Sequence, residues 1–78
     1  MVAGVSDVPV VDARGMRCPW PALRAARAMR DVFSVMILAD DPIAPGELAA
    51  LAEQQGWTIT GTVDDRAPAF LLTKQQSD

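Results

Sequence analysis

The stretch Phe33-Ser34-Val35-Met36-Ile37-Leu38-Ala39 decides how this chain folds, because it is almost entirely apolar. Valine and isoleucine favour strands, and a continuous apolar run is typical of a strand that is covered on at least one face. Asp40-Asp41-Pro42 follows and marks a turn. We therefore predict a central strand over residues 33–39 and place the other elements around it.

Two elements are expected before this strand. Residues 8–13 form a short apolar run that predicts a first strand, in which Pro9 favours an edge or a strand end and Gly15 marks the turn that follows. Residues 19–30 predict a helix, since Pro19 and Pro21 are tolerated in a first turn, where amides lack intrahelical acceptors.

The predicted first helix has two different faces. One face carries small or apolar side chains: Ala22, Ala25, Ala26 and Met29. The opposite face carries charged side chains: Arg24, Arg27 and Asp31. A face made of such small residues allows the helix to lie close against a sheet.

Three elements are expected after the central strand. A helix is predicted from about Pro45, at its first position, to Gln55, with Leu48, Leu51 and Ala52 as its apolar stripe and Gly56 as its stop. Residues 57–63 alternate between Trp57, Ile59 and Val63 on one side and threonines on the other, which predicts a half-exposed strand. Residues 68–74 predict a last strand with Phe70 and Leu72 on one face.

The element order is therefore β-α-β-α-β-β. It predicts one four-stranded mixed sheet with both helices on one face, because right-handed crossovers place them together, and with the threonines facing solvent on the other. A chain of 78 residues suits a single domain, 1–78, and we expect its ordered core at about 8–74.

The amino-acid composition limits which kinds of site the chain can form. The single cysteine and the absence of histidine rule out an internal disulfide, a Cys–His catalytic pair and the usual zinc ligands, and no metal or cofactor is expected. No charged secretory leader or membrane-length apolar run is visible, so we expect a soluble cytoplasmic protein. The small size and charged surface favour a monomer.

Charge is unevenly distributed along the chain. Although the net charge is −3, five of the seven basic residues are Arg14, Arg17, Arg24, Arg27 and Arg30. This cluster is either a solvated helix face or a docking surface for an acidic partner. A nucleic-acid binder is the weaker interpretation, because the total charge is negative and aromatic residues are few.

Cys18 is the candidate reactive group, since it lies between Arg17 and Pro19 at a predicted helix start. A free thiol with a pKa of about 8.5 is only about 3% ionised at neutral pH. The helix start and the nearby arginines predict a modestly lowered pKa for the Cys18 thiol. The effect is limited because Pro19 and Pro21 lack the N–H groups that would stabilise the thiolate. The prolines hold the thiol on a stiff junction. The alternative is that Cys18 is a small buried hydrophobic residue of the core.

Two neighbouring features have open interpretations. Trp20 either contacts a partner or covers the core. Asp40 and Asp41 either bind a cation, cap the second helix or form the turn, of which the turn is favoured.

The segment Asp12-Ala13-Arg14-Gly15-Met16-Arg17-Cys18-Pro19-Trp20-Pro21 resembles the Cys-Pro-x-Pro signature of the TusA/SirA-like sulfur-carrier family. The resemblance extends through Asp40-Asp41-Pro42 to about Lys74 and implies a two-layer α/β sandwich. The family pattern usually has a glycine-containing turn after the first helix, whereas residues 30–34 contain no glycine.

The resemblance also implies a function. It makes Cys18 the catalytic residue of a sulfurtransferase, accepting sulfane sulfur as a persulfide and passing it on, for example in tRNA thiolation. The supporting motif residues are Asp12, Gly15, Arg17, Pro19 and Pro21, and the candidate docking residues are Arg14, Trp20, Arg24 and Arg27.

The expected partners are a cysteine desulfurase or rhodanese-type donor and an acceptor protein, with no membrane or direct nucleic-acid contact. The alternative is a non-enzymatic regulatory or interaction module in which Cys18 is structural or redox-sensing.

Overall fold

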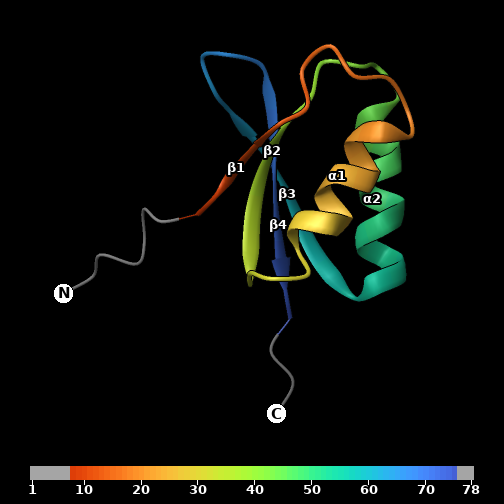
Figure 1. Cartoon of the computed structure of the whole chain (residues 1–78), viewed down its shortest axis with the longest axis vertical. Helices are drawn as coiled ribbons and strands as arrows, with labels where there is room; N and C mark the ends of the chain where they lie inside the picture. The colour runs from red at the N-terminus through yellow and green to blue at the C-terminus, as the bar shows by residue number, and fades with distance from the viewer. Residues whose placement is uncertain (1–7, 76–78) are drawn as a thin grey trace, which may run out of the picture.

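Four strands form one sheet, and both helices lie against the same face of it (Figure 1). The computed structural model describes residues 8–75; residues 1–7 and 76–78, which the single-domain prediction includes, lie outside the described residues. The elements are β1 (Val10–Asp12), α1 (Trp20–Ala28), β2 (Ser34–Leu38), α2 (Ala44–Gln55), β3 (Trp57–Val63) and β4 (Pro68–Lys74). The predicted order and the two-layer arrangement are confirmed.

The strands are arranged in the order β1-β2-β4-β3. β2 pairs in parallel with β1, where Val11 lies opposite Ile37, and antiparallel with β4, where Ile37 lies opposite Phe70. β2 is therefore an interior strand, as its apolar sequence predicts, and the sheet is mixed. β1 is an edge strand, which fits Pro9 immediately before it.

The core lies between the sheet and the helices. Ile37 of β2, Met29 just after α1 and Leu48 of α2 are fully buried there. Ala25 on α1 is also fully buried, so its small side chain brings the helix close to the sheet. On the opposite face of the sheet the threonines of β3 are exposed, as the alternation predicts.

Several boundaries differ by a few residues from those expected. β1 is shorter than the predicted strand at residues 8–13, and α2 begins at Ala44, so that Pro45 is its second residue. Gly56 ends α2 in the left-handed conformation with φ of 76°, which explains why a glycine stands there. The segment after α1 contains no glycine: the helix ends at Ala28, two residues earlier than predicted, and β2 begins at Ser34, one residue later than predicted.

Neither helix is a candidate for crossing a membrane: within residues 8–75, no helix has the length and apolar character that this requires.

Candidate functional site

Two loops lie side by side at one end of the sheet, where the parallel strands β1 and β2 both end (Figure 1). Residues 13–19 connect β1 to α1, and residues 39–43 connect β2 to α2. The Gly15 N–H donates to Oδ1 of Asp40 at 2.9 Å, and the Cys18 N–H donates to Oδ2 of Asp41 at 2.7 Å. The adjacent aspartates thus fasten the cysteine loop to the loop after β2.

Asp41 has a second partner. Its Oδ1 accepts a hydrogen bond from the Ile43 N–H at 3.1 Å, immediately before α2. These bonds from Ile43 and Cys18 lower the pKa of Asp41, because they stabilise the ionised carboxylate. One side chain therefore fixes both the start of α2 and the backbone of Cys18. The sequence favoured a turn role for Asp41, and this long-range link to Cys18 was missed.

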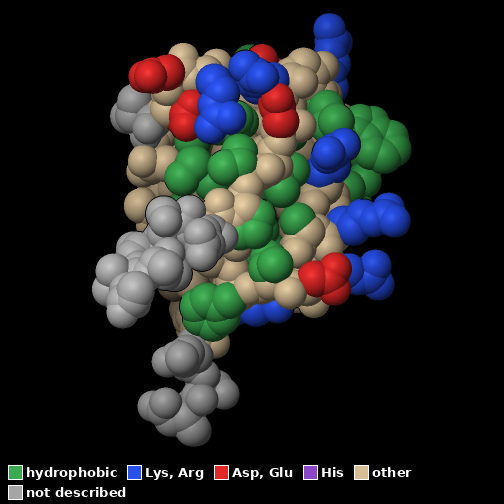
Figure 2. Space-filling model, turned by 60° about the vertical axis from the view of Figure 1, so that its left-hand side comes forward, with side chains coloured by type: hydrophobic (Ala, Val, Ile, Leu, Met, Phe, Trp, Pro, Cys, Tyr) green, Lys and Arg blue, Asp and Glu red, His purple; other side chains and the backbone are tan. Residues whose placement is uncertain are grey.

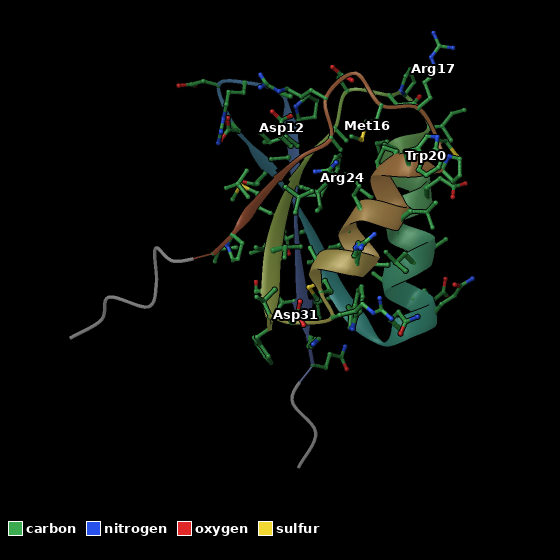
Figure 3. All side chains as sticks on the ribbon, viewed as in Figure 1. Asp12, Met16, Arg17, Trp20, Arg24 and Asp31 are labelled. Atoms are coloured by element: carbon green, nitrogen blue, oxygen red, sulfur yellow. The ribbon has the colours of Figure 1, made fainter. Side chains whose placement is uncertain are left out.

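Cys18 is half-buried and directly precedes Pro19, the N-cap residue of α1; the peptide bond between them is cis. Its side chain lines an open depression of about 520 Å³ between the two loops. Arg17 and Ile43 also line it, and the Arg17 side chain extends outward from the end of the molecule (Figure 3). A thiol in this position is accessible from one side while its backbone is held in place.

The predicted lowering of the Cys18 pKa is wrong. Burial raises the pKa of the thiol, and the Glu47 carboxylate raises it further through its charge and by hydrogen bonding to the protonated form. The charge of Asp41 acts in the same direction. The helix start offers little compensation, because the prolines lack N–H groups and the Trp20 N–H donates to the Arg17 carbonyl at 2.8 Å.

Two of the expected docking arginines lie away from the thiol. Arg14 forms a two-pronged ion pair with Asp12, with Nε–Oδ1 and Nη2–Oδ2 distances of 2.9 and 2.7 Å, which holds the pKa of Asp12 well below its usual range. Arg24 lies over a different depression, between α1 and β1, that Val11 also lines (Figure 3). Of the arginines expected near Cys18, only Arg17 lines the thiol's depression.

The first turn of α1 presents a hydrophobic surface next to the thiol. Trp20 is 59% exposed and Leu23 is 51% exposed, whereas Pro21 between them in the sequence is buried. Of the two interpretations of Trp20, the exposure favours a contact residue. Ile43, also 59% exposed, extends this surface on the other side of Cys18.

Glu47 and Ile43 are site residues that sequence reasoning missed. The only signal was their place at the start of the second predicted helix, which follows the Asp-Asp-Pro turn. Nothing in the local pattern shows that this helix start lies beside Cys18.

The fold and the site define a class of protein: a small two-layer α/β domain that holds one thiol at a loop-to-helix junction. The family model described as Sulfurtransferase TusA matches residues 10–74, and the chain belongs to this family. Members of the family transfer or carry sulfur in relays between donor and acceptor proteins, and in these general terms the chain is a sulfurtransferase or sulfur carrier.

A solved structure has the same fold. The crystal structure of the SirA-like protein from Desulfitobacterium hafniense is similar to this chain with a TM-score of 0.77 and 24% sequence identity. The match covers 88% of this chain and 100% of the other. The family resemblance and the two-layer fold expected from the sequence are confirmed.

Proposed function

We propose that Cys18 accepts a sulfane sulfur from a persulfide-bearing donor protein, holds it as a persulfide and passes it to an acceptor protein. The observation that carries this proposal is the placement of Cys18, the chain's single thiol, beside an open depression with its backbone N–H bound by Asp41. Because the thiol must stay reduced between transfers, the proposal places the protein in the cytoplasm.

The transfer is an exchange reaction that needs no external oxidant. The Cys18 thiolate attacks the terminal sulfur of the donor's persulfide, a new S–S bond forms on Cys18, and the donor's S–S bond breaks. The donor sulfur leaves as a thiolate and takes up the proton that Cys18 lost. In the second transfer, the acceptor attacks the terminal sulfur of the Cys18 persulfide. The S–S bond on Cys18 breaks, and Cys18 is released as the thiolate.

The surroundings of Cys18 suit a carrier better than a self-sufficient catalyst. Burial and the carboxylates raise the pKa of the thiol, so the resting protein holds little thiolate. Rigid presentation then matters more than activation, because a fixed thiol loses less entropy when a partner's sulfur is brought to it. The motif residues around Cys18 support this rigid presentation. Asp12 and Gly15 shape the loop between β1 and α1, and Pro19 and Pro21 stiffen the junction between this loop and α1.

Intact-mass spectrometry of the protein after incubation with a cysteine desulfurase and cysteine tests the proposal. The wild type should gain the mass of one sulfur atom, and Cys18→Ser should gain nothing. Sulfinic acid adds nearly the same mass, so the sample is measured again after dithiothreitol, which removes a persulfide but leaves a sulfinic acid.

No reversible mass gain on the wild type would contradict the proposal. Full activity of Cys18→Ser in cells would favour the alternative, a regulatory or interaction module in which the cysteine has no transfer role.

A further inference from the structure

The surroundings of the thiol carry more negative than positive charge. Asp40 and Asp41 line the depression beside Cys18, and within residues 8–75 the only basic side chain that lines it is Arg17. Glu47, in the first turn of α2, adds a third carboxylate, which hydrogen-bonds to the thiol. An anion that approaches Cys18 therefore meets three negative charges and one positive charge.

The backbone holds the two aspartates in place. Oδ2 of Asp41 accepts a hydrogen bond from the Cys18 N–H at 2.7 Å, and its Oδ1 accepts one from the Ile43 N–H at 3.1 Å. Oδ1 of Asp40 accepts a hydrogen bond from the Gly15 N–H at 2.9 Å. Because these bonds fix the carboxylates, the aspartates do not turn away from an approaching anion.

Other arginines at this end of the molecule are already paired. Arg14 forms an ion pair with Asp12 and Arg66 forms one with Asp64, with N–O distances of 2.7 and 2.8 Å. Figure 2 shows acidic and basic side chains gathered together at the upper end of the molecule. Each pair has no net charge, so it does little to attract an anion.

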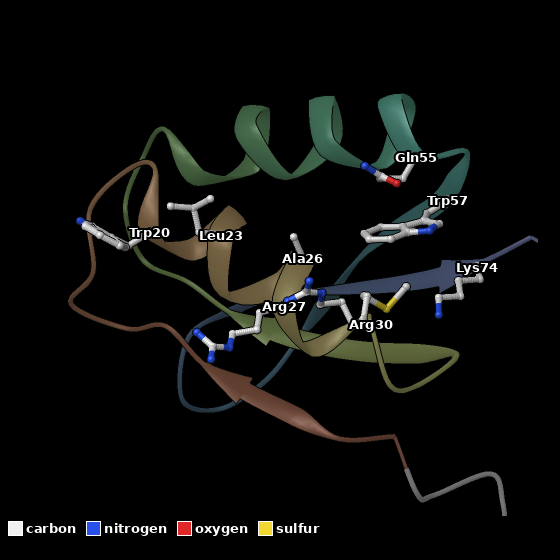
Figure 4. A pocket seen from close by; sticks show the side chains of 9 residues that line it. Trp20, Leu23, Ala26, Arg27, Arg30, Gln55, Trp57 and Lys74 are labelled. Atoms are coloured by element: carbon white, nitrogen blue, oxygen red, sulfur yellow. The ribbon is translucent and has the colours of Figure 1, made fainter.

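Further basic side chains face a different part of the surface. Arg27, Arg30 and Lys74 line a separate depression along α1 (Figure 4), and none of the three lines the depression of the thiol. Positive charge and the thiol are therefore on separate surfaces.

The starts of the two helices do not offset the carboxylates. A helix start attracts anions through its free N–H groups. In α1, the Trp20 N–H donates to a loop carbonyl at 2.8 Å, and Pro21 has no N–H. In α2, the Ala44 N–H donates to the Asp41 carbonyl at 2.9 Å, and Pro45 has no N–H. The first two positions of each helix thus offer no free N–H group to an anion.

We infer that the carboxylates of Glu47 and Asp41 determine which sulfur compounds react with Cys18, by disfavouring small anions such as inorganic polysulfide relative to neutral and cationic compounds. The inference rests on the proposed function for the importance of sulfur. A repulsive element against the wrong substrate is a common source of specificity. Contacts over a wider surface let a donor protein overcome the repulsion, whereas a free anion makes no such contacts.

The same charges act on the thiol itself. Glu47 and Asp41 raise the pKa of Cys18, so their field reaches the sulfur atom. A reagent that brings a negative charge to this atom meets the same field and should react more slowly than a matched cation.

Methanethiosulfonate reagents measure this selection. The Cys18 thiolate attacks the thiol-derived sulfur of the reagent, a disulfide forms, and the bond to the sulfonyl group breaks, which releases methanesulfinate. One reagent carries a sulfonate group and the other a trimethylammonium group. Since both react with the same thiolate, the ratio of their rates does not depend on the fraction of Cys18 that is ionised. The ratio therefore separates charge selection from a change in pKa.

The rate of the cationic reagent divided by that of the anionic one should be about tenfold higher for the folded wild type than for the urea-unfolded chain at low salt. It should fall toward the unfolded value at about 0.5 M salt. A folded chain with the same ratio as the unfolded chain would overturn the inference.

Variants identify the carboxylate responsible. Glu47→Gln should lower the rate ratio about threefold. Glu53→Gln makes the same charge change about 9 Å further along α2 and should lower the ratio less than about 1.5-fold. Circular dichroism checks that both variants keep the fold. Equal effects of the two variants would overturn the role of Glu47.

Sulfur loading, followed by intact mass, tests the consequence for sulfur compounds. The Cys18 thiolate attacks a sulfur atom of polysulfide, and a shorter polysulfide or hydrosulfide ion leaves. Added salt should speed this loading more than it speeds alkylation by neutral iodoacetamide, and this excess should be smaller in Glu47→Gln. An equal excess in both proteins would overturn the inference for sulfur compounds. If Cys18 takes sulfur from neither polysulfide nor a cysteine desulfurase, the proposed function fails, while the methanethiosulfonate ratio still decides the charge selection.

Discussion

Replacing Glu47 by glutamine should make Cys18 more reactive at neutral pH. The Glu47 carboxylate raises the pKa of the thiol through its charge and by hydrogen bonding to the protonated form. Glutamine has nearly the same shape but no charge, whereas burial and the charge of Asp41 remain. The pKa of Cys18 should therefore fall toward that of a free thiol.

The size of the effect follows from two opposing changes. A free thiol is about 3% ionised at pH 7, and Cys18 is ionised less than this because its pKa is raised. Each unit by which the pKa falls increases the thiolate fraction about tenfold and decreases the nucleophilicity of that thiolate about threefold. Alkylation at pH 7 should thus become about threefold faster for each pKa unit recovered.

The assay is the rate of reaction with iodoacetamide between about pH 6 and about pH 10, with the urea-unfolded chain as reference. Because the chain has one cysteine, every label reports on Cys18. Glu53→Gln is the control, since it makes the same charge change at an exposed position of α2 and Glu53 is not among the groups that raise the pKa of Cys18. The reasoning is refuted if Glu47→Gln does not accelerate alkylation, or if the folded wild type reacts faster than the unfolded chain at pH 7.

Three further predictions concern the fold. Leu48→Ala removes a fully buried side chain from the core and should lower the free energy of unfolding in urea by about 3 kcal/mol; a loss below about 1 kcal/mol would contradict the core assignment. Gly56→Ala should cost about 1 kcal/mol because φ is 76°, while Gly46→Ala, inside α2 with open space around it, should stabilise by about 0.5 kcal/mol, so the same sign for both would refute the backbone argument. The ion pair with Arg66 lowers the pKa of Asp64 to about 2, so its stabilisation is present above about pH 4 and is lost as the pH falls toward 2; Asp64→Asn should therefore lose less stability than the wild type over this range in thermal melts.

Burial and the carboxylates of Glu47 and Asp41 raise the pKa of the Cys18 thiol, and the open depression that Cys18 lines leaves the thiol accessible. Substitutions at Glu47 should change the reactivity of Cys18 toward small molecules and toward a persulfide donor alike, because both reactions use the thiolate.

Most of the fold follows from local sequence patterns. The apolar run at residues 33–39 predicts the interior strand, the small-residue face with Ala25 predicts a helix lying close to the sheet, and Gly56 predicts where the second helix ends. These features are determined locally because side-chain periodicity and glycine conformations act within a few residues. The place of Cys18 at the start of the first helix is predictable for the same reason.

The sign of the Cys18 pKa shift and the depression that Trp20 and Trp57 both line depend on tertiary structure. The sequence around the thiol contains arginines and predicts a lowered pKa, but the groups that face it are Asp41 and Glu47, from the loop after β2 and from α2. In the same way, Trp20 of α1 and Trp57 of β3 line one depression only because the helices pack on the sheet. Sequence by itself determined which elements form and which residue carries the thiol, whereas the electrostatic surroundings of the thiol depend on contacts between distant segments that only the packed fold creates.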